Sequence, residues 1–152
     1  MSEPKFLYIT YIRATPEQVW QGLLDAKFTR QYWAHENLSD WKRGSSWEHR
    51  RTDDARTLDL VGEVIEAIPS RRLVLSWANP ADMANRARHS RVTLELEPIE
   101  DMVRLSVTHE DLAGDPQMLG KISAGWPRVL SSLKSLLETG RALPTWAMAK
   151  SS

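Results

Sequence analysis

The sequence contains no cysteine. This absence excludes disulfide bonds, thiolate zinc sites, iron–sulfur ligation and thiol nucleophiles. The sequence also lacks a run of about 18 apolar residues, the length at which a membrane-spanning helix becomes a candidate. Its start, Met1-Ser-Glu-Pro-Lys, lacks the basic-then-apolar pattern of an export signal. We therefore expect a cytoplasmic protein with no membrane partner.

The chain has no excess of charge of either sign. Lys and Arg number 20, Asp and Glu also number 20, and the formal net charge at pH 7 is zero. A protein that binds nucleic acid through its phosphates normally has a basic surplus, so we expect no nucleic-acid partner. The length of 152 residues fits one domain over 1–152. Its core is expected over about 5–140, followed by a tail over 143–152 without periodic pattern.

The common catalytic and nucleotide-binding motifs are missing. There is no G-x-S-x-G, no G-x-G-x-x-G and no phosphate-binding loop, and His35-Glu36 lacks the second histidine of H-E-x-x-H. His49 and His109 have no carboxylate at matching strand parity, which makes them a poor metal site. The sequence predicts neither a metal ion nor a cofactor.

The N-terminal part predicts one strand followed by two short helices. Residues 5–13 alternate β-branched and aromatic side chains, as in a strand that is apolar on both faces. Its outer face, either Phe6-Tyr8 or Leu7-Ile9-Tyr11, needs cover from helices or from a second subunit. Thr15-Pro16-Glu17-Gln18 supplies a cap, a first-turn proline and a capping box for one helix, and residues 25–33 form the next.

The rest of the chain predicts a meander of strands and one long helix. The strands are expected over 47–51, 58–67, 73–77, 90–97 and 103–109, and a helix of about 24 residues is expected between Asp115 and Gly140. An antiparallel sheet with one apolar face needs a covering layer, and only this helix is long enough to provide it. The fold class is therefore α+β.

Five sequence motifs accompany this order of elements: ATPEQVW at 14–20, FTRQYW at 28–33, GEV at 62–64, RLVLSW at 72–77 and GWPRVLSSLKSLLE at 125–138. Together they are similar to the SRPBCC (START-like, helix-grip) superfamily, and within it to the bacterial group named after the activator of heat shock protein 90 ATPase. The resemblance implies a curved antiparallel sheet of about six strands around the long C-terminal helix. It also implies a cavity between sheet and helix, which in many relatives holds a lipophilic molecule.

Tryptophan is over-represented, because it supplies seven of the twelve aromatic residues. Tryptophan combines apolar bulk with an N–H donor and is favoured in pockets and interfaces. Trp20 is expected to pack in the core beneath the first helices. Trp33, Trp47, Trp77 and Trp126 are predicted to surround one cavity.

Two histidines are candidates for the same cavity. His109 shares the strand parity of the apolar residues before it, and His49 shares that of Trp47, so each could orient a ligand or act as a general acid or base. The alternative is a structural histidine bonded to the backbone. His35 and His89 lie in loop-like sequence and are expected to be exposed. The predicted cavity lining is Trp33, Trp47, His49, Trp77, Leu94, Leu105, His109, Ile122 and Trp126.

Three functions fit these predictions. We favour a non-enzymatic protein that holds a small lipophilic or amphipathic molecule, with Arg51 or Arg91 as a partner for an acidic head group. The second is a cyclase or dehydratase in which cavity His, Arg and carboxylate groups meet the substrate. The third, implied by the resemblance, is regulation of a chaperone ATPase. We expect it least, because a first strand near residue 5 leaves no room for the additional N-terminal domain of the eukaryotic activators. A homodimer is the remaining partner prediction.

Overall fold

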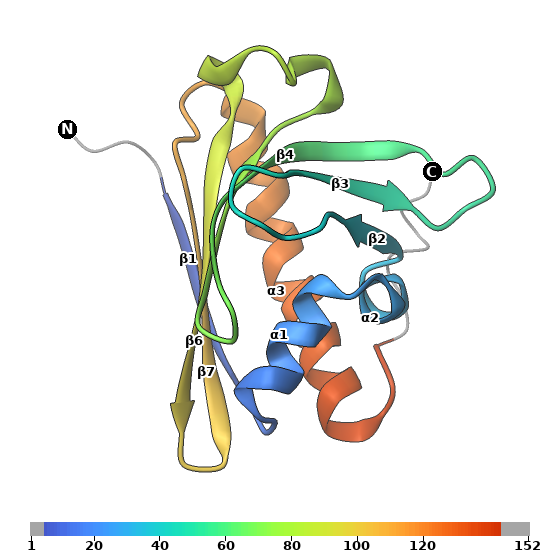
Figure 1. Ribbon diagram of the computed structural model, residues 1–152, viewed down its shortest axis with the longest axis vertical. Coiled ribbons are helices and arrows are strands. Elements are labelled where there is room, and N and C mark those ends of the chain that lie inside the picture. The colour runs from blue at the N-terminus through green and yellow to red at the C-terminus, as the bar shows by residue number, and fades with distance from the viewer. Residues whose placement is uncertain (1–4, 144–152) are drawn as a thin grey trace.

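The computed structural model describes residues 5–143 and has the predicted α+β helix-grip fold (Figure 1). Antiparallel strands form one seven-stranded sheet in the order β1-β7-β6-β5-β4-β3-β2. The strands are β1 (Phe6–Ile12), β2 (His35–Leu38), β3 (Ser46–Arg51), β4 (Leu58–Ile68), β5 (Arg72–Trp77), β6 (Ser90–Ile99) and β7 (Met102–Glu110). The helices are α1 (Pro16–Leu24), α2 (Ala26–Tyr32), the 3₁₀ turns η1 (Pro80–Asp82) and η2 (Arg86–Arg88), and α3 (Pro116–Thr139).

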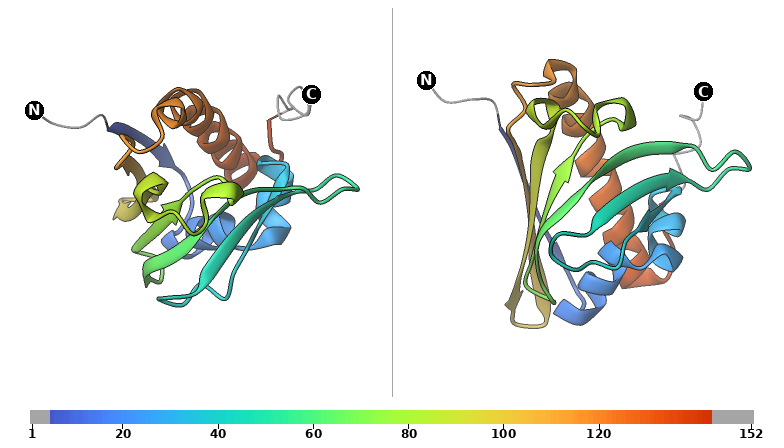
Figure 2. Two further views of the ribbon diagram at one scale, coloured as in Figure 1. Left: turned by 90° about the horizontal axis from the view of Figure 1, so that it is seen from above. Right: turned by 45° about the horizontal axis from the view of Figure 1, so that its top comes forward.

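The sheet curls around α3 (Figures 1 and 2). Strands β1, β6 and β7 run side by side along one flank of the molecule, while β2, β3 and β4 turn away and extend across it. Helix α3 lies in the angle between these two parts and contacts β1, α1 and α2. Its apolar stripe, which includes the fully buried Leu130 and Leu133, fills the concave face of the sheet.

The sheet has one strand more than the expected six or so. Strand β2 is the four-residue run HENL, which is too short and too polar to show strand alternation. It acquires its conformation by pairing with β3, from His35 opposite Arg51 to Leu38 opposite Glu48. The expectation that His35 lies in a loop is therefore wrong.

The predicted capping box of α1 and the predicted stop of α3 at Gly140 are confirmed. Thr15 Oγ1 accepts from the backbone N–H of Gln18 at 3.1 Å, and the backbone N–H of Thr15 donates to Gln18 Oε1 at 2.8 Å, which completes the capping box. The Asp25 carboxylate caps α2 by accepting from Lys27 N at 2.9 Å. Helix α3 spans 24 residues, continues through Pro127 and stops at Gly140, whose φ of 86° is left-handed.

Strand β1 forms one edge of the sheet. Phe6 and Tyr8 pack against the core, whereas Leu7 and Tyr11 are 58% and 44% exposed. Of the two faces that the sequence left open, the one with Leu7 and Tyr11 is thus the outer one. Lys134 Nζ donates to the carbonyl oxygen of Tyr11 at 2.5 Å and ties α3 to this end of the edge.

Candidate functional site

A pocket of about 360 Å³ lies between α3 and strands β3, β4 and β5. Side chains from the end of α2, from β2 and from the segment after β5 complete it. Most of its lining is aromatic or aliphatic, with a few polar groups among them. The lining consists of Trp33, His35, His49, Asp59, Leu60, Trp77, Asn79, Met118, Lys121, Ile122, Gly125, Trp126 and Val129.

Three tryptophans form the aromatic part of the pocket. Trp33 directly follows α2, and its ring centroid lies 5.5 Å from that of Trp126 on α3, with an interplanar angle of 60°. Trp77, the last residue of β5, lies 5.4 Å from Trp126 in a tilted arrangement. Edge-to-face and tilted pairs at such separations are favourable aromatic geometries. The pocket therefore presents indole rings from three separate elements.

The fourth predicted tryptophan, Trp47, lies behind this group. Its ring is 1% exposed, lies 5.3 Å from Trp77 and does not line the pocket. Its indole N–H donates to the carbonyl oxygen of Ser76 at 2.8 Å, which satisfies the buried donor. Trp47 thus belongs to the same aromatic cluster without facing the pocket, while Trp20 packs in the core as expected.

His109 is fully buried and does not line the pocket either. Its Nδ1 accepts from the indole N–H of Trp126 at 3.1 Å. The proton of the neutral ring therefore sits on Nε2 and is donated to Ser90 Oγ at 2.7 Å. Ser90 in turn donates to the carbonyl oxygen of Trp77 at 3.2 Å. Burial lowers the pKa of His109 to about 3, so the ring is neutral at pH 7.

His49 reaches the pocket from β3 and is 3% exposed. Its ring meets Trp33 edge to face at 4.7 Å and stacks on His35 at 4.0 Å with an interplanar angle of 4°. Burial, together with the charge of the neighbouring His35, holds the pKa of His49 well below its usual range. His49 is therefore a neutral imidazole on the pocket surface.

His35 is half-buried beside His49, which corrects the expectation that it is exposed. Its Nδ1 lies 2.9 Å from the carbonyl oxygen of Trp33, and its Nε2 lies 2.8 Å from Asp59 Oδ2. Arg51 Nε donates to the same carboxylate oxygen at 2.8 Å. Burial alone would raise the pKa of Asp59, but the hydrogen bonds from Arg51 and His35 outweigh it and keep the pKa below its usual range. Arg51 is therefore engaged by Asp59.

Of the remaining predicted residues, some line the pocket and others lie outside it. Ile122 lines the pocket, whereas Leu94 and Leu105 are buried in the core and do not line it. Arg91 is exposed on β6, away from the lining. His89 was expected to be exposed, but it is half-buried. Its ring nitrogens are hydrogen-bonded to Ser76 Oγ at 3.3 Å and to the carbonyl oxygens of Asp82, the last residue of η1, and of Met83, both at 3.1 Å.

More than half of the lining residues were not among those predicted from the sequence. Four of these residues share the face of α3 that carries Ile122 and Trp126, at steps of three and four residues, so helical periodicity could have found them: Met118, Lys121, Gly125 and Val129. Asp59 and Leu60 are consecutive on β4, yet both line the pocket. Because successive side chains of a strand point to opposite faces, strand alternation would not place both on one surface. His35 and Asn79 reach the pocket from a strand and a loop segment that have no sequence signal.

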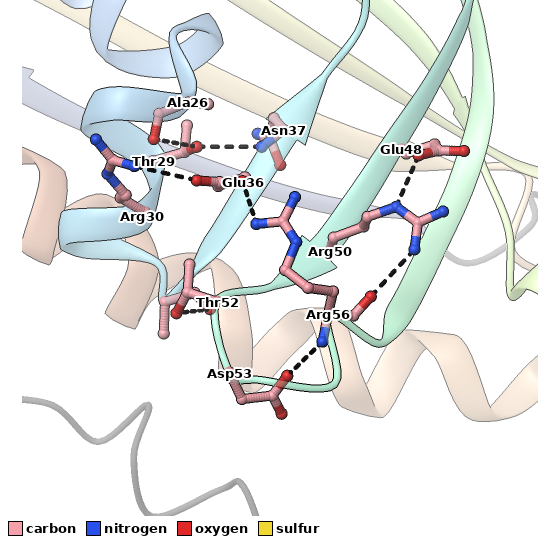
Figure 3. A network of polar contacts seen from close by, with 11 residues as sticks. Ala26, Thr29, Arg30, Glu36, Asn37, Glu48, Arg50, Thr52, Asp53 and Arg56 are labelled. Carbon is pink, nitrogen blue, oxygen red and sulfur yellow. Dashed lines mark hydrogen bonds and ion pairs between the residues drawn. The ribbon is translucent and has the colours of Figure 1, made fainter.

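Strand β2 is held against α2 and the β3–β4 loop by the polar network in Figure 3. The Glu36 carboxylate accepts from Arg30 Nη1 at 3.3 Å and from Arg56 Nη1 at 2.5 Å. The backbone N–H of Asn37 donates to Thr29 Oγ1 at 3.1 Å. These bonds fix the short strand that carries His35 to the pocket and Asn37 to His49.

Within residues 5–143, no group of three or more His, Asp or Glu side chains is placed to hold a metal ion. The same residues contain no helix that is long and apolar enough to cross a membrane.

Comparison with known proteins places this fold among several solved structures. CalU16 from Micromonospora echinospora is 22% identical, with 92% of this chain and 77% of that chain covered and a TM-score of 0.71. The Aha1 protein from Colwellia psychrerythraea, solved as a dimer, is 20% identical, with 91% and 99% covered and a TM-score of 0.74. DynU16, a protein of the dynemicin biosynthetic locus, is 19% identical, with 93% and 49% covered and a TM-score of 0.71.

At these identities the structures establish the fold alone. The sequence model of the family described as activator of Hsp90 ATPase homolog 1-like protein matches residues 13–138. This match covers most of the chain and agrees with the resemblance of its motifs. The chain therefore belongs to the activator of Hsp90 ATPase homolog 1-like family.

Proposed function

We propose that this protein is a non-enzymatic binder of a small, largely apolar molecule, which it holds between α3 and the sheet. The observation that carries the proposal is the pocket of about 360 Å³ with three indole rings in its lining. Pockets for small ligands typically measure about 300–1,000 Å³ and combine an apolar surface with a few polar anchors. The volume lies at the small end of that range and suits a molecule of one to three rings.

The hydrogen bonds of the polar residues favour binding over acid–base chemistry. Both ring nitrogens of His109 are engaged, by Trp126 and Ser90, and the ring lies outside the pocket lining. Asp59 faces the pocket but already accepts hydrogen bonds from His35 and Arg51. A cyclase or dehydratase needs a proton donor or acceptor within hydrogen-bond reach of its substrate, and His109 and Asp59 are committed elsewhere. His49 does line the pocket, but burial holds its pKa well below the usual range, which makes the ring a weak base at neutral pH.

The relatives support a small-molecule role without naming the ligand. DynU16, which shares this fold, belongs to the dynemicin biosynthetic locus. The family name keeps chaperone contact as the alternative. The chaperone's ATPase rate with and without this protein tests that alternative directly, and an unchanged rate leaves small-molecule binding as the proposal. A cytoplasmic location stays a prediction.

Two helical glycines allow a matched test of the pocket. A Cβ added at Gly125, which lines the pocket, or at Gly120 would meet no atom within 4 Å. Gly125→Leu should place its side chain in the pocket, whereas Gly120→Leu should place it on the exposed side of α3. Both remove a glycine from a helix interior and should stabilise the fold by up to about 1 kcal/mol.

A thermal-shift screen of small aromatic and aliphatic compounds, followed by calorimetric titration, measures binding. A compound at 100 times its Kd should stabilise the wild-type protein by about 2.7 kcal/mol. Gly125→Leu should weaken or abolish this effect, and Gly120→Leu should retain it. A screen without any stabilising compound would overturn the proposal, as would equal binding by the two variants.

We also propose a homodimer that covers the outer face of β1. Leu7 is 58% exposed on the edge strand β1. The free backbone N–H and C=O groups of an edge strand can pair with a second copy of the chain, and the Leu7 side chain would be buried in that contact. The Colwellia Aha1 protein, which shares the fold, was solved as a dimer. Light scattering after size exclusion should give twice the chain mass of 17.4 kDa, and Leu7→Lys should shift it to the monomer.

A further inference from the structure

The side-chain amide of Asn37 has one orientation in this fold. Asn37 lies on β2 directly opposite His49 on β3, and it is 7% exposed. Its Nδ2 donates to the carbonyl oxygen of Leu23 at 3.4 Å, a partner that only accepts hydrogen bonds. The amide oxygen Oδ1 must therefore be the atom that faces His49.

This orientation fixes the tautomer of His49. His49 Nδ1 lies 2.5 Å from Asn37 Oδ1, and because that oxygen can only accept, Nδ1 carries the proton. In a neutral imidazole the other nitrogen, Nε2, then has a lone pair and no proton. Asn37 thus turns His49 into a hydrogen-bond acceptor at Nε2.

The neighbouring His35 keeps His49 in this state. The partners of His35, the Trp33 carbonyl and the Asp59 carboxylate, are both acceptors, so both hydrogen bonds form together only when the His35 ring is protonated. The two imidazoles stack at 4.0 Å. Burial of the His49 ring, together with the neighbouring His35, holds the pKa of His49 well below its usual range, so Nε2 remains an acceptor at neutral pH.

The lone pair of His49 Nε2 opens into the pocket. Two side-chain polar atoms of residues 5–143 are inaccessible to solvent and lack a hydrogen-bond partner: Trp77 Nε1 and Arg104 Nε. His49 Nε2 also lacks a partner within residues 5–143 but is not one of these two atoms, so it is accessible to solvent. Because the His49 ring is 97% buried and lines the pocket, the small accessible surface at Nε2 faces that pocket.

We propose that His49 selects planar aromatic ligands that carry an N–H or O–H donor on the ring edge. The indoles of Trp33, Trp77 and Trp126 bind the aromatic body, and the donor pairs with His49 Nε2. This inference rests on the proposed function, because it specifies the ligand class of the same pocket. A ligand without a donor leaves the Nε2 lone pair desolvated and unpaired, which weakens its binding.

Two isomers test this selection without changing the protein. The compounds 3-methylindole and 1-methylindole have the same composition and nearly the same apolar surface, but only the first retains its N–H. A single neutral hydrogen bond, with the penalty for leaving its acceptor unpaired, corresponds to about tenfold in Kd. Calorimetric titration of the wild-type chain should therefore give about tenfold tighter binding of 3-methylindole.

Two variants assign the preference to His49. His49→Phe should bind both isomers with similar Kd, while the matched control His89→Phe, outside the pocket lining, should keep the preference. In wild-type protein the ¹⁵N resonance of the unprotonated Nε2 of His49 should move upfield with 3-methylindole and stay in place with 1-methylindole. This measurement does not depend on the folding of either variant.

The outcomes separate the two proposals. Two results would overturn the selection by His49 and leave the binding function intact. One is equal binding of both isomers to the wild-type chain, and the other is a His49 Nε2 resonance that does not shift when 3-methylindole is added. Failure of both isomers and of every compound in the wider screen would overturn both.

Discussion

His109 is buried between its hydrogen-bond partners Trp126 and Ser90, so we predict that the stability of the protein depends on pH. A single substitution of His109 should reduce this pH dependence. The pKa of His109 is about 3 in the folded protein, against about 6.5 in an unfolded chain. Above pH 6.5 the ring is neutral in both states. As the pH falls below 6.5, the unfolded chain takes up a proton that the folded ring accepts only near pH 3, so stability is lost across this window.

The magnitude follows from the two pKa values. At pH 5 the loss from one such histidine is about 2 kcal/mol relative to pH 7.5. His49, whose pKa is also lowered, contributes with the same sign. His109→Gln removes one of these two contributions. The Gln side chain can still accept from Trp126 Nε1 and donate to Ser90 Oγ, so it preserves the hydrogen bonds without the titration.

Urea unfolding followed by tryptophan fluorescence at pH 7.5, 6 and 5 measures the effect. His109→Gln will be the less stable protein at pH 7.5, but the gap to wild type should narrow by about 2 kcal/mol at pH 5. Comparing the two proteins cancels the titration of the carboxylates, and His89→Gln serves as the control. Parallel stability profiles for wild type and His109→Gln would refute the reasoning, as would an NMR titration in which His109 protonates near pH 6.5.

Three further substitutions test what holds the site together. At Gly62 a Cβ would lie 1.9 Å from the Ser76 carbonyl oxygen, so Gly62→Ala should lose more than about 4 kcal/mol in chemical denaturation, and near-wild-type stability would contradict this packing. Trp47→Phe leaves the same carbonyl without its donor and should lose about 2 kcal/mol by that assay; an unchanged midpoint would show that the bond contributes nothing. Glu36→Gln removes the charge between Arg30 and Arg56 and should lose about 1 kcal/mol at low salt and less at 1 M salt. A loss of equal size at both salt concentrations would argue against an ionic origin.

The parts of the fold that the sequence predicts are those specified by local signals. Thr15 and Gln18 make a capping box wherever the helix lies, and Gly140 stops α3 because its left-handed φ suits glycine. Strands β6 and β7 are predicted by the alternation of apolar and polar residues along them. Strand β2 has no such signal, because its four residues become a strand through pairing with β3 and through the bonds of Glu36 to two arginines.

The site was harder to predict because strand parity gives the face of a residue but not its depth. His109 was expected on the inner face and His49 slightly more toward solvent, and both are buried. The ring of Trp126 packs against His109 and hydrogen-bonds to it, whereas β3 lies far enough along the curved sheet for His49 to reach the pocket. That difference depends on where α3 crosses the sheet, which no single strand encodes.

The chemistry of His49 also depends on how distant parts of the chain meet. Its Nε2 is an acceptor only because β2 and β3 pair in the register that sets Asn37 opposite His49, and because α1 supplies the Leu23 carbonyl that orients the amide. A shift of β2 by one residue would bring Glu36 or Leu38 opposite His49 and turn Asn37 to the other face. The register of β2, a strand that the sequence does not predict, therefore decides what kind of ligand the pocket can recognise.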